Sequence, residues 1–187
     1  MMQSKSETMN SNFVKNYLKD LKGTKMNSIA HLNLKDFNSD QINFILEQAK
    51  QRVIDHYLEF TGSVLPQEAW ALFQTNHAVI VDVRTFEERK FVGFIENTLH
   101  IPWATGTALD RNSNFAEDLE TQVGKDQLIF LICRSGKRSA AAANVAFNAG
   151  LKNVYNIDQG FEGDINENRQ RGTFNGWRFH HLPWIQE

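Results

Sequence analysis

The single cysteine of this chain is followed by residue types that stabilise a negatively charged sulfur. Cys133 ends the apolar run 128–132, and the residues after it are cations and small side chains: Arg134, Ser135, Gly136, Lys137, Arg138 and Ser139. An alanine-rich stretch, 140–147, comes next and predicts a helix. Between a buried strand and a helix, backbone N–H groups converge and the helix dipole adds positive potential, so an anion is stabilised there. The pattern therefore predicts a nucleophilic thiolate at Cys133.

The residues of this loop, 134–139, each have a role in that interpretation. The cations favour a negative charge on the sulfur. Gly136 permits tight curvature or a positive φ, and Ser139 is predicted to cap the N-terminus of the following helix. The alternative is that Cys133 is only a small buried apolar residue, as many free cysteines are. The cations beside it favour catalysis over that alternative.

The composition indicates one domain with an extension. The chain has 187 residues, 41% of them hydrophobic, which is enough for a proper core. Its net charge of -2 and its dispersed basic residues give no reason to expect nucleic acid or a membrane as a partner. One cysteine cannot form an internal disulfide, and no signal peptide or transmembrane run is visible. A reducing, cytoplasmic location is therefore expected, and it suits an exposed reactive thiol.

Metal binding is not expected from the sequence. The six histidines show no ligand spacing with the one cysteine. Asp164, Asn166 and Asn168 alternate as the first ligands of a calcium loop would, but the glycine and the terminal glutamate of such a loop are not at the required offsets.

Two segments precede the part of the chain that contains the cysteine. Residues 1–38 are predicted to be mostly flexible, with one short helix over 11–22. Over residues 39–60, apolar side chains recur at intervals of three and four and predict an amphipathic helix of about six turns. We expect this helix, in the segment 39–62, to pack on the domain that follows. Packing on a second subunit, which would make a homodimer, is the alternative.

Residues 63–187 alternate between predicted strands and helices and form the predicted main domain. Strands are expected over 78–83, 98–101, 128–133 and 153–157, helices over 66–74, 87–91, 114–123 and 139–149, and a loop over 104–114. The run 78–83 is rich in β-branched residues, as is typical of a strand buried on both faces. Short strands separated by helices predict an α/β fold, with a small parallel sheet and helices on both of its faces.

A carboxylate interrupts the first of these strands. Asp82 is costly in a buried strand unless it has a partner. Arg84 lies two residues further on, and so on the same face of the strand. Either Arg84 or the end of another loop is expected to supply that partner.

Four stretches together resemble the single-domain rhodaneses, a family of sulfurtransferases. They are residues 81–84 (VDVR) followed by Glu88, residues 93–102 (GFIENTLHIP), the loop 133–139, and the tail 158–164 with Gly176-Trp177 and Leu182-Pro183-Trp184. The resemblance covers about residues 63–187 and leaves 1–62 outside. It implies a three-layer rhodanese-like fold, to which the N-terminal helix is an extension.

The resemblance also implies a chemistry. In rhodaneses the loop cysteine attacks the outer sulfur of an anionic donor such as thiosulfate, holds it as a persulfide, and passes it to cyanide, a thiol or a protein acceptor. Cys133 would then be the nucleophile and sulfur carrier, and the loop amides would stabilise the persulfide anion. The loop cations would attract the donor, while Asp82, Arg84 and Glu88 would support the site. No metal or organic cofactor is implied.

Two positions depart from the common pattern of the family. Phe94 follows Gly93 where many members have a histidine, and this change has little bearing on the chemistry. Phe161 stands where many members have a second glycine, and it is expected to reshape the rim of the pocket.

Two other functions are left open by the sequence. A cysteine phosphatase or an arsenate reductase also holds a thiolate in a ring of amides. Tyrosine phosphatases, however, place an arginine six positions after the cysteine, where this chain has Ser139, and here the arginine comes one residue earlier at Arg138. The other alternative is a rhodanese-like binding or regulatory module, or a sulfur carrier without turnover. The intact cysteine and loop favour an active enzyme.

Overall fold

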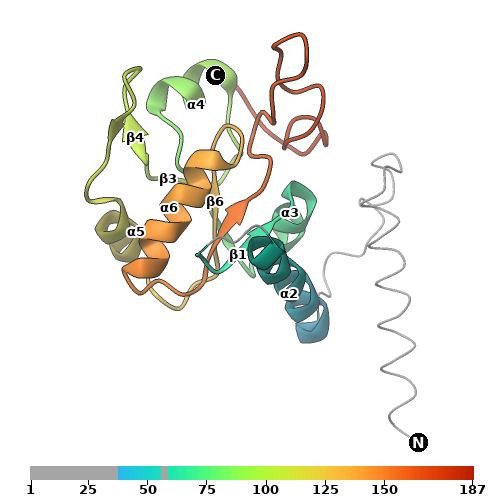
Figure 1. Cartoon of the computed structure of the whole chain (residues 1–187), viewed down its shortest axis with the longest axis vertical. Coiled ribbons are helices and arrows are strands. Elements are labelled where there is room, and N and C mark those ends of the chain that lie inside the picture. The colour runs from blue at the N-terminus through green and yellow to red at the C-terminus, as the bar shows by residue number, and fades with distance from the viewer. Residues whose placement is uncertain (1–37, 56–58) are drawn as a thin grey trace, which may run out of the picture.

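A computed structural model of the chain describes residues 38–55 and 59–187 (Figure 1). The helix predicted over 11–22, and nearly all of the segment predicted to be flexible, lie outside the described residues. No helix in the described ranges is both long enough and apolar enough to span a bilayer.

In the described part of the chain, five parallel strands form one sheet in the order β1-β7-β6-β2-β3. The strands are β1 (Gly62–Val64), β2 (Val79–Asp82), β3 (Leu99–His100), β6 (Ile129–Ile132) and β7 (Val154–Ile157). Strand β6 is in the centre of this order. The residue that follows it, Cys133, therefore lies at the carboxyl edge of the sheet, with a neighbouring strand on either side.

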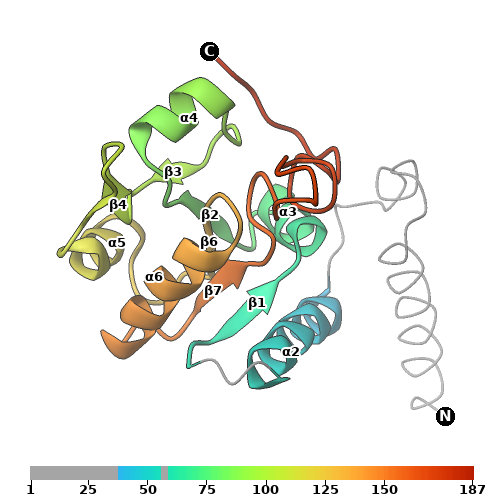
Figure 2. The same cartoon turned by 45° about the horizontal axis from the view of Figure 1, so that its top comes forward.

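Helices cover both faces of the sheet (Figure 2). Their bounds are α2 (Ser39–Asp55), α3 (Pro66–Gln74), α4 (Phe86–Val92), α5 (Phe115–Val123) and α6 (Lys137–Asn148). One core lies between the sheet and helices α5 and α6, and the other lies between the sheet and helices α2 and α3. Side chains of β6 enter the two cores alternately, since Ile129 and Leu131 point one way and Phe130 and Ile132 the other.

Most of the predicted elements are present, and the predicted α/β fold with a parallel sheet is confirmed. Strand β1 was not expected, because three residues are too few to show a pattern, and it is formed by parallel pairing with β7. The expected loop 104–114 contains a short antiparallel pair, β4 (Ala104–Thr105) and β5 (Asp110–Arg111). Helix α6 begins two residues earlier than expected, because Gly136 at its N-cap adopts a left-handed conformation with φ 84°.

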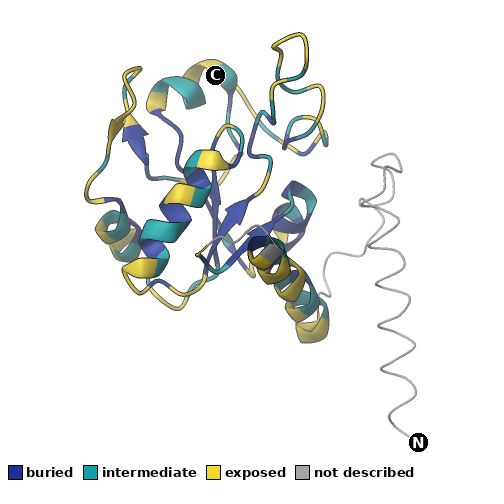
Figure 3. Cartoon of the chain, in the orientation of Figure 1, coloured by how far each residue is buried: buried dark blue, intermediate teal, exposed yellow. Residues whose placement is uncertain are grey.

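Helix α2 packs closely on the edge strand β1. Its buried face consists of Ile45, Ala49 and Val53, and its outer face is exposed (Figure 3). A Cβ atom at Gly62 of β1 would lie 2.6 Å from the ring of Tyr155 and 3.0 Å from the backbone of Ala49, so glycine there leaves room for both the ring and the helix. The helix is described only to Asp55, short of the predicted end at residue 60, and residues 56–58 are outside the description.

Candidate active site

The cysteine lies beneath its loop rather than on the surface. Cys133 continues the alternation of β6, so its side chain points into the same core as Leu131, under α5 and α6. Only 1% of Cys133 is exposed. The expectation of an exposed thiol was therefore wrong, because the direction of the strand places the sulfur below the backbone of the loop.

The segment that follows β7, called the C-terminal segment below, holds the backbone of the loop in place. The carbonyl of Cys133 accepts a hydrogen bond from the Phe161 N–H at 2.8 Å, and the carbonyl of Arg134 accepts one from the Glu162 N–H at 2.8 Å. Gly160 lies so close that a Cβ atom there would be 2.6 Å from the Cys133 carbonyl oxygen. The first carbonyl groups of the loop are thereby turned toward this segment.

The amide groups of the loop remain available for an anion. Within residues 38–55 and 59–187, no hydrogen bond is described from the backbone N–H groups of residues 134–138. The later ones also belong to the first turn of α6, where N–H groups have no partner inside the helix. The loop therefore offers unpaired donors at the positive end of a helix of 12 residues.

The hydroxyl of Ser139 contacts the sulfur directly. Its Oγ lies 3.2 Å from Cys133 Sγ and 2.6 Å from the Oδ1 of Asn156 on β7. The prediction that Ser139 caps α6 was wrong, since the helix already starts at Lys137 and Gly136 occupies the N-cap. Ser139 is instead the third residue of the helix, and its side chain points down to the sulfur.

Arg138 connects the loop to helix α4. It donates to both carboxylate oxygens of Glu88, with Nη1 at 2.8 Å from Oε2. Burial alone would raise the pKa of the Glu88 carboxyl, but hydrogen bonds from Arg138 and the Thr85 N–H and the charge of Arg138 lower it below its usual value. Burial works against the charge of Arg138, yet Glu88 and, to a smaller extent, Cys133 raise its pKa. The predicted supporting residue Glu88 is therefore beside the loop.

Asp82 and Arg84 form a fully buried pair behind the site. Arg84 Nη2 donates to Asp82 Oδ2 at 2.7 Å and to the carbonyl of Gly93 at 2.8 Å. The partner predicted from the spacing along the strand is thus confirmed. The guanidinium of Arg84 also lies over the ring of Phe161, 4.0 Å from its centre. Phe161 is wholly buried and lines neither cleft beside the loop, so any effect on the pocket rim acts through the residues packed against it.

Asp82 and Arg84 support the loop without contacting it directly. Neither Asp82 nor Arg84 has a described hydrogen bond to residues 133–139. Arg84 acts on the loop through Phe161, whose N–H holds the Cys133 carbonyl. Asp82 and Arg84 therefore stabilise the position of Phe161, which packs behind the loop.

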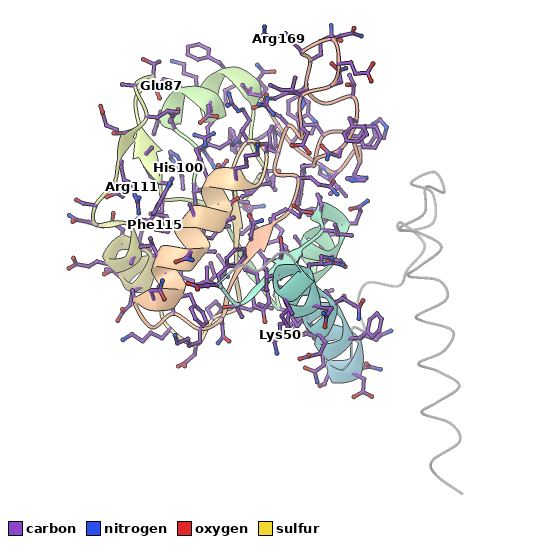
Figure 4. All side chains as sticks on the ribbon, viewed as in Figure 1. Lys50, Glu87, His100, Arg111, Phe115 and Arg169 are labelled. Atoms are coloured by element: carbon purple, nitrogen blue, oxygen red, sulfur yellow. The ribbon has the colours of Figure 1, made fainter. Side chains whose placement is uncertain are left out.

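A cationic cleft opens beside the loop. It has a volume of about 520 Å³ and is lined by Leu109, Arg134, Ser135, Lys137, Arg138, Asp164, Ile165 and Arg171. Four cations face a single carboxylate in this lining, which suits an anionic ligand. Arg171 belongs to the loop whose outer end is marked by Arg169 in Figure 4. Sequence reasoning missed Arg171, Leu109 and Ile165, because none of them belongs to a motif.

A second cleft shares Ser135, Lys137 and Asp164 with the first. Its volume is about 380 Å³, and its lining is Arg52, Ser63, Ser135, Gly136, Lys137, Ala140, Asn156, Asp158, Gln159 and Asp164. This lining includes a residue of α2, Arg52, which donates to the carbonyl of Ser63 at 2.8 Å. Helix α2 therefore contributes to the surroundings of the loop.

Comparisons with known proteins agree with this geometry. The family model of the rhodanese-like domain matches residues 65–167. The uncharacterized protein RP600 of Rickettsia prowazekii is 40% identical over 117 residues, which cover 60% of this chain and 87% of that protein. The thiosulfate sulfurtransferase GlpE of Actinobacillus succinogenes is 28% identical over 100 residues, covering 54% of this chain and 80% of that protein.

A solved structure extends the agreement to the fold. Rv0390 from M. tuberculosis is 36% identical, with a TM-score of 0.62, over 68% of this chain and 99% of that chain. The resemblance seen in the sequence motifs is thereby confirmed. Since the family model covers more than half of the residues, the chain belongs to the rhodanese-like domain family.

Proposed function

We propose that this chain is a sulfurtransferase that moves a sulfane sulfur from an anionic donor to a thiophilic acceptor through a persulfide on Cys133. The observation that carries the proposal is the position of the sulfur at the carboxyl end of β6, beneath a loop whose amide groups are unpaired. The similarity to a thiosulfate sulfurtransferase supports it.

In the first half of the reaction, the sulfur is loaded. The Cys133 thiolate attacks the outer sulfur of thiosulfate and forms a new S–S bond. The bond between the two sulfur atoms of the donor breaks, and its electron pair leaves with sulfite. The cations of the cleft attract the donor, and the N–H groups of residues 134–138 stabilise the negative charge on the outer sulfur of the persulfide.

In the second half, the sulfur is discharged. The acceptor, cyanide or a thiolate on a small molecule or protein, attacks the outer sulfur of the persulfide. The S–S bond breaks, and its electron pair returns to Cys133 Sγ. The hydroxyl of Ser139, 3.2 Å from Sγ, is placed to stabilise the returning charge. We propose a reducing compartment such as the cytoplasm for this cycle, since it depends on a free thiol.

A phosphatase reaction is less well supported by the same loop. Such an enzyme needs a guanidinium free to bind two oxygens of a phosphate. Arg138 already donates through both of its Nη atoms to Glu88. The position six residues after Cys133 is filled by Ser139, whose hydroxyl faces the sulfur.

The test is thiocyanate formation from thiosulfate and cyanide. The wild-type chain should form thiocyanate, and Cys133→Ser should reduce the rate to that of the uncatalysed reaction. Ser113→Ala, which changes an exposed serine outside the cleft, is the control and should be as active as the wild type. Equal activity of the wild type and Cys133→Ser would refute the proposed nucleophile.

A further inference from the structure

A row of buried polar side chains leads from the sulfur to the edge of the sheet. Ser139 contacts Cys133 Sγ and the Oδ1 of Asn156, and Asn156 Nδ2 donates to Ser63 Oγ at 3.1 Å. Ser139, Asn156 and Ser63 are 0%, 4% and 7% exposed. Asn156 is the polar member of β7, which is otherwise Val154, Tyr155 and Ile157, and burial of an amide is costly without hydrogen-bonding partners.

The hydroxyl of Ser139 has more acceptors than it can serve. A hydroxyl has one hydrogen to donate. Three acceptors surround it, namely Cys133 Sγ at 3.2 Å, Asn156 Oδ1 at 2.6 Å and the Gly136 carbonyl at 3.1 Å. The Asn156 amide is oriented by its donation to Ser63, which leaves its oxygen facing Ser139. The sulfur and the amide oxygen therefore compete for one hydrogen.

We infer that Asn156 is a positioning residue that restrains the reactivity of Cys133 by competing for the hydroxyl hydrogen of Ser139. When the sulfur is an uncharged thiol, the closer amide oxygen is the better acceptor. When the sulfur is a thiolate, donation to Sγ is charge-assisted and becomes the stronger bond. Asn156 thus stabilises the uncharged sulfur, and Ser139 stabilises the charged one.

The same competition bears on each half of the proposed transfer cycle, on which this part of the inference rests. In the persulfide the negative charge lies on the outer sulfur, so the inner Sγ is uncharged and the Ser139 hydrogen returns to Asn156. During discharge the S–S bond breaks and the electron pair moves to Sγ. The Ser139 hydroxyl then turns from the amide to the sulfur and lowers the energy of the departing thiolate.

The inference is tested by alkylation of Cys133 with iodoacetamide at pH 6, where the rate follows the thiolate fraction. Because the chain has one cysteine, the label reports this site alone. Asn156→Leu removes the competing acceptor, and it should increase the rate about 3- to 10-fold, as expected for one hydrogen bond. Ser139→Ala should decrease the rate by a similar factor.

The double variant separates this mechanism from a general loosening of the fold. If Asn156 acts through Ser139, then Asn156→Leu should have no effect in a Ser139→Ala background. Asn153→Leu is the matched control, because Asn153 is exposed, immediately precedes β7 and bonds only to the Asp126 carbonyl among described side-chain contacts. It should leave the rate unchanged.

A second substitution keeps the test decisive if Asn156→Leu does not fold. Asn156→Asp has nearly the same shape, and its carboxylate should hold the Ser139 hydrogen more strongly and slow alkylation below the wild-type rate. The inference is overturned if Asn156→Asp reacts faster than wild type, or if Asn156→Leu accelerates the reaction equally without Ser139. Alkylation needs no sulfur donor, so these results are independent of whether thiocyanate is formed.

Discussion

The cations around the Cys133 loop differ in exposure and in whether a carboxylate already binds them. Arg138 is held by Glu88, whereas Arg134 and Lys137 are exposed at the cleft. Arg171 reaches the cleft from another loop, anchored by one hydrogen bond to the Gly163 carbonyl at 2.6 Å. The anchoring and the position of Arg171 suggest a role in attracting the donor rather than in the chemical step.

Arg171→Ala should therefore raise the KM for thiosulfate about 3- to 10-fold with little change in kcat, because it removes long-range attraction. The difference from wild type should shrink as salt concentration rises, since salt screens exposed charges. Steady-state kinetics at two ionic strengths measure both effects. Arg169→Ala is the control, an exposed cation on the same loop but outside the lining of the cleft. Equal effects of the two substitutions would show that only net charge matters.

At the scale of elements, helix α2 is joined to the domain by more than apolar packing. Arg52 donates to both carboxylate oxygens of Glu68 in α3, at 2.6 and 2.7 Å. The side chain of Glu68 is 1% exposed and that of Arg52 is 24% exposed. Glu68 also accepts from the Leu65 N–H at the start of α3. The pair therefore ties α2, β1 and the N-terminus of α3 together next to the second cleft.

Arg52→Ala should lower the free energy of unfolding by about 1 to 3 kcal/mol, because it removes both hydrogen bonds that Arg52 donates to the buried side chain of Glu68. Burial raises the pKa of Glu68 to about 8, so this side chain can take up a proton when Arg52 is absent. Urea unfolding followed by circular dichroism measures the change. Lys50→Ala is the control in the same helix, since the Lys50–Glu47 pair is exposed and such pairs contribute little. A loss for Arg52→Ala no larger than that for Lys50→Ala would show that α2 does not depend on this pair.

The C-terminal segment is the second element that shapes the site. The N–H groups of residues 161–163 donate to the loop carbonyls, and further along Trp177 Nε1 donates to the Pro183 carbonyl at 2.9 Å. Gln159, with φ 66°, accepts hydrogen bonds from the Gly176 N–H and from His180 Nε2. The long irregular end of the chain is therefore folded back on itself, and this explains how it can support the loop from behind.

At the scale of the whole molecule, carboxyl groups with shifted pKa values couple stability to pH. Burial raises the pKa of Glu68 to about 8, so the contribution of this group is lost as pH rises. Asp82 and Glu88 act in the opposite direction. Burial alone would raise the pKa of Asp82, but the charge and hydrogen bonds of Arg84, together with the charge of Arg89, lower it below its usual value of 3.8. A lowered pKa in the folded chain means that the stabilisation is present above pH 3.8 and is lost as pH falls through the folded value. The lowered pKa of Glu88 acts in the same direction below its usual 4.5.

Asp82→Asn should therefore destabilise the chain by about 3 to 5 kcal/mol at pH 7, because Arg84 remains buried without a counter-charge. The difference from wild type should narrow as pH falls below 3.8, because Asp82 of the unfolded wild-type chain then binds a proton that the folded chain binds only at lower pH. Urea unfolding at pH 7 and pH 3 measures the two differences. Asp110→Asn, at an exposed position, is the control and should leave the free energy of unfolding unchanged at both pH values. A constant difference at both pH values would contradict the role given to the Asp82 charge.

The parts of the site that were predictable are those within a few residues of each other. The loop around Cys133 has a local pattern, and Asp82 and Arg84 are brought together by the two-residue period of a strand. Contacts between segments that are far apart in the sequence have no such local pattern. Arg138 and Glu88 are 50 residues apart, and their bidentate pairing depends on the fold bringing α4 near the start of α6.

Burial was also hard to predict at the ends of strands. The thiol of Cys133 was expected to be exposed, and it is buried because the direction of the strand places it inside. The role of Asn156 had no sequence signal, since a single asparagine in a strand gives no hint that it faces Ser139 on the preceding helix. The fold class was easier, because it depends on the order of strands and helices rather than on individual contacts.

The central claim is that Cys133 holds the transferred sulfur, and intact-protein mass spectrometry after exposure to thiosulfate tests it most directly. The protein should gain the mass of one sulfur atom, peptide mapping should place that atom on Cys133, and addition of cyanide should remove it with release of thiocyanate. Cys133→Ser should gain nothing. Failure of the wild-type chain to gain sulfur from thiosulfate or from any other sulfane donor, or a gain that persists in Cys133→Ser, would contradict the mechanism.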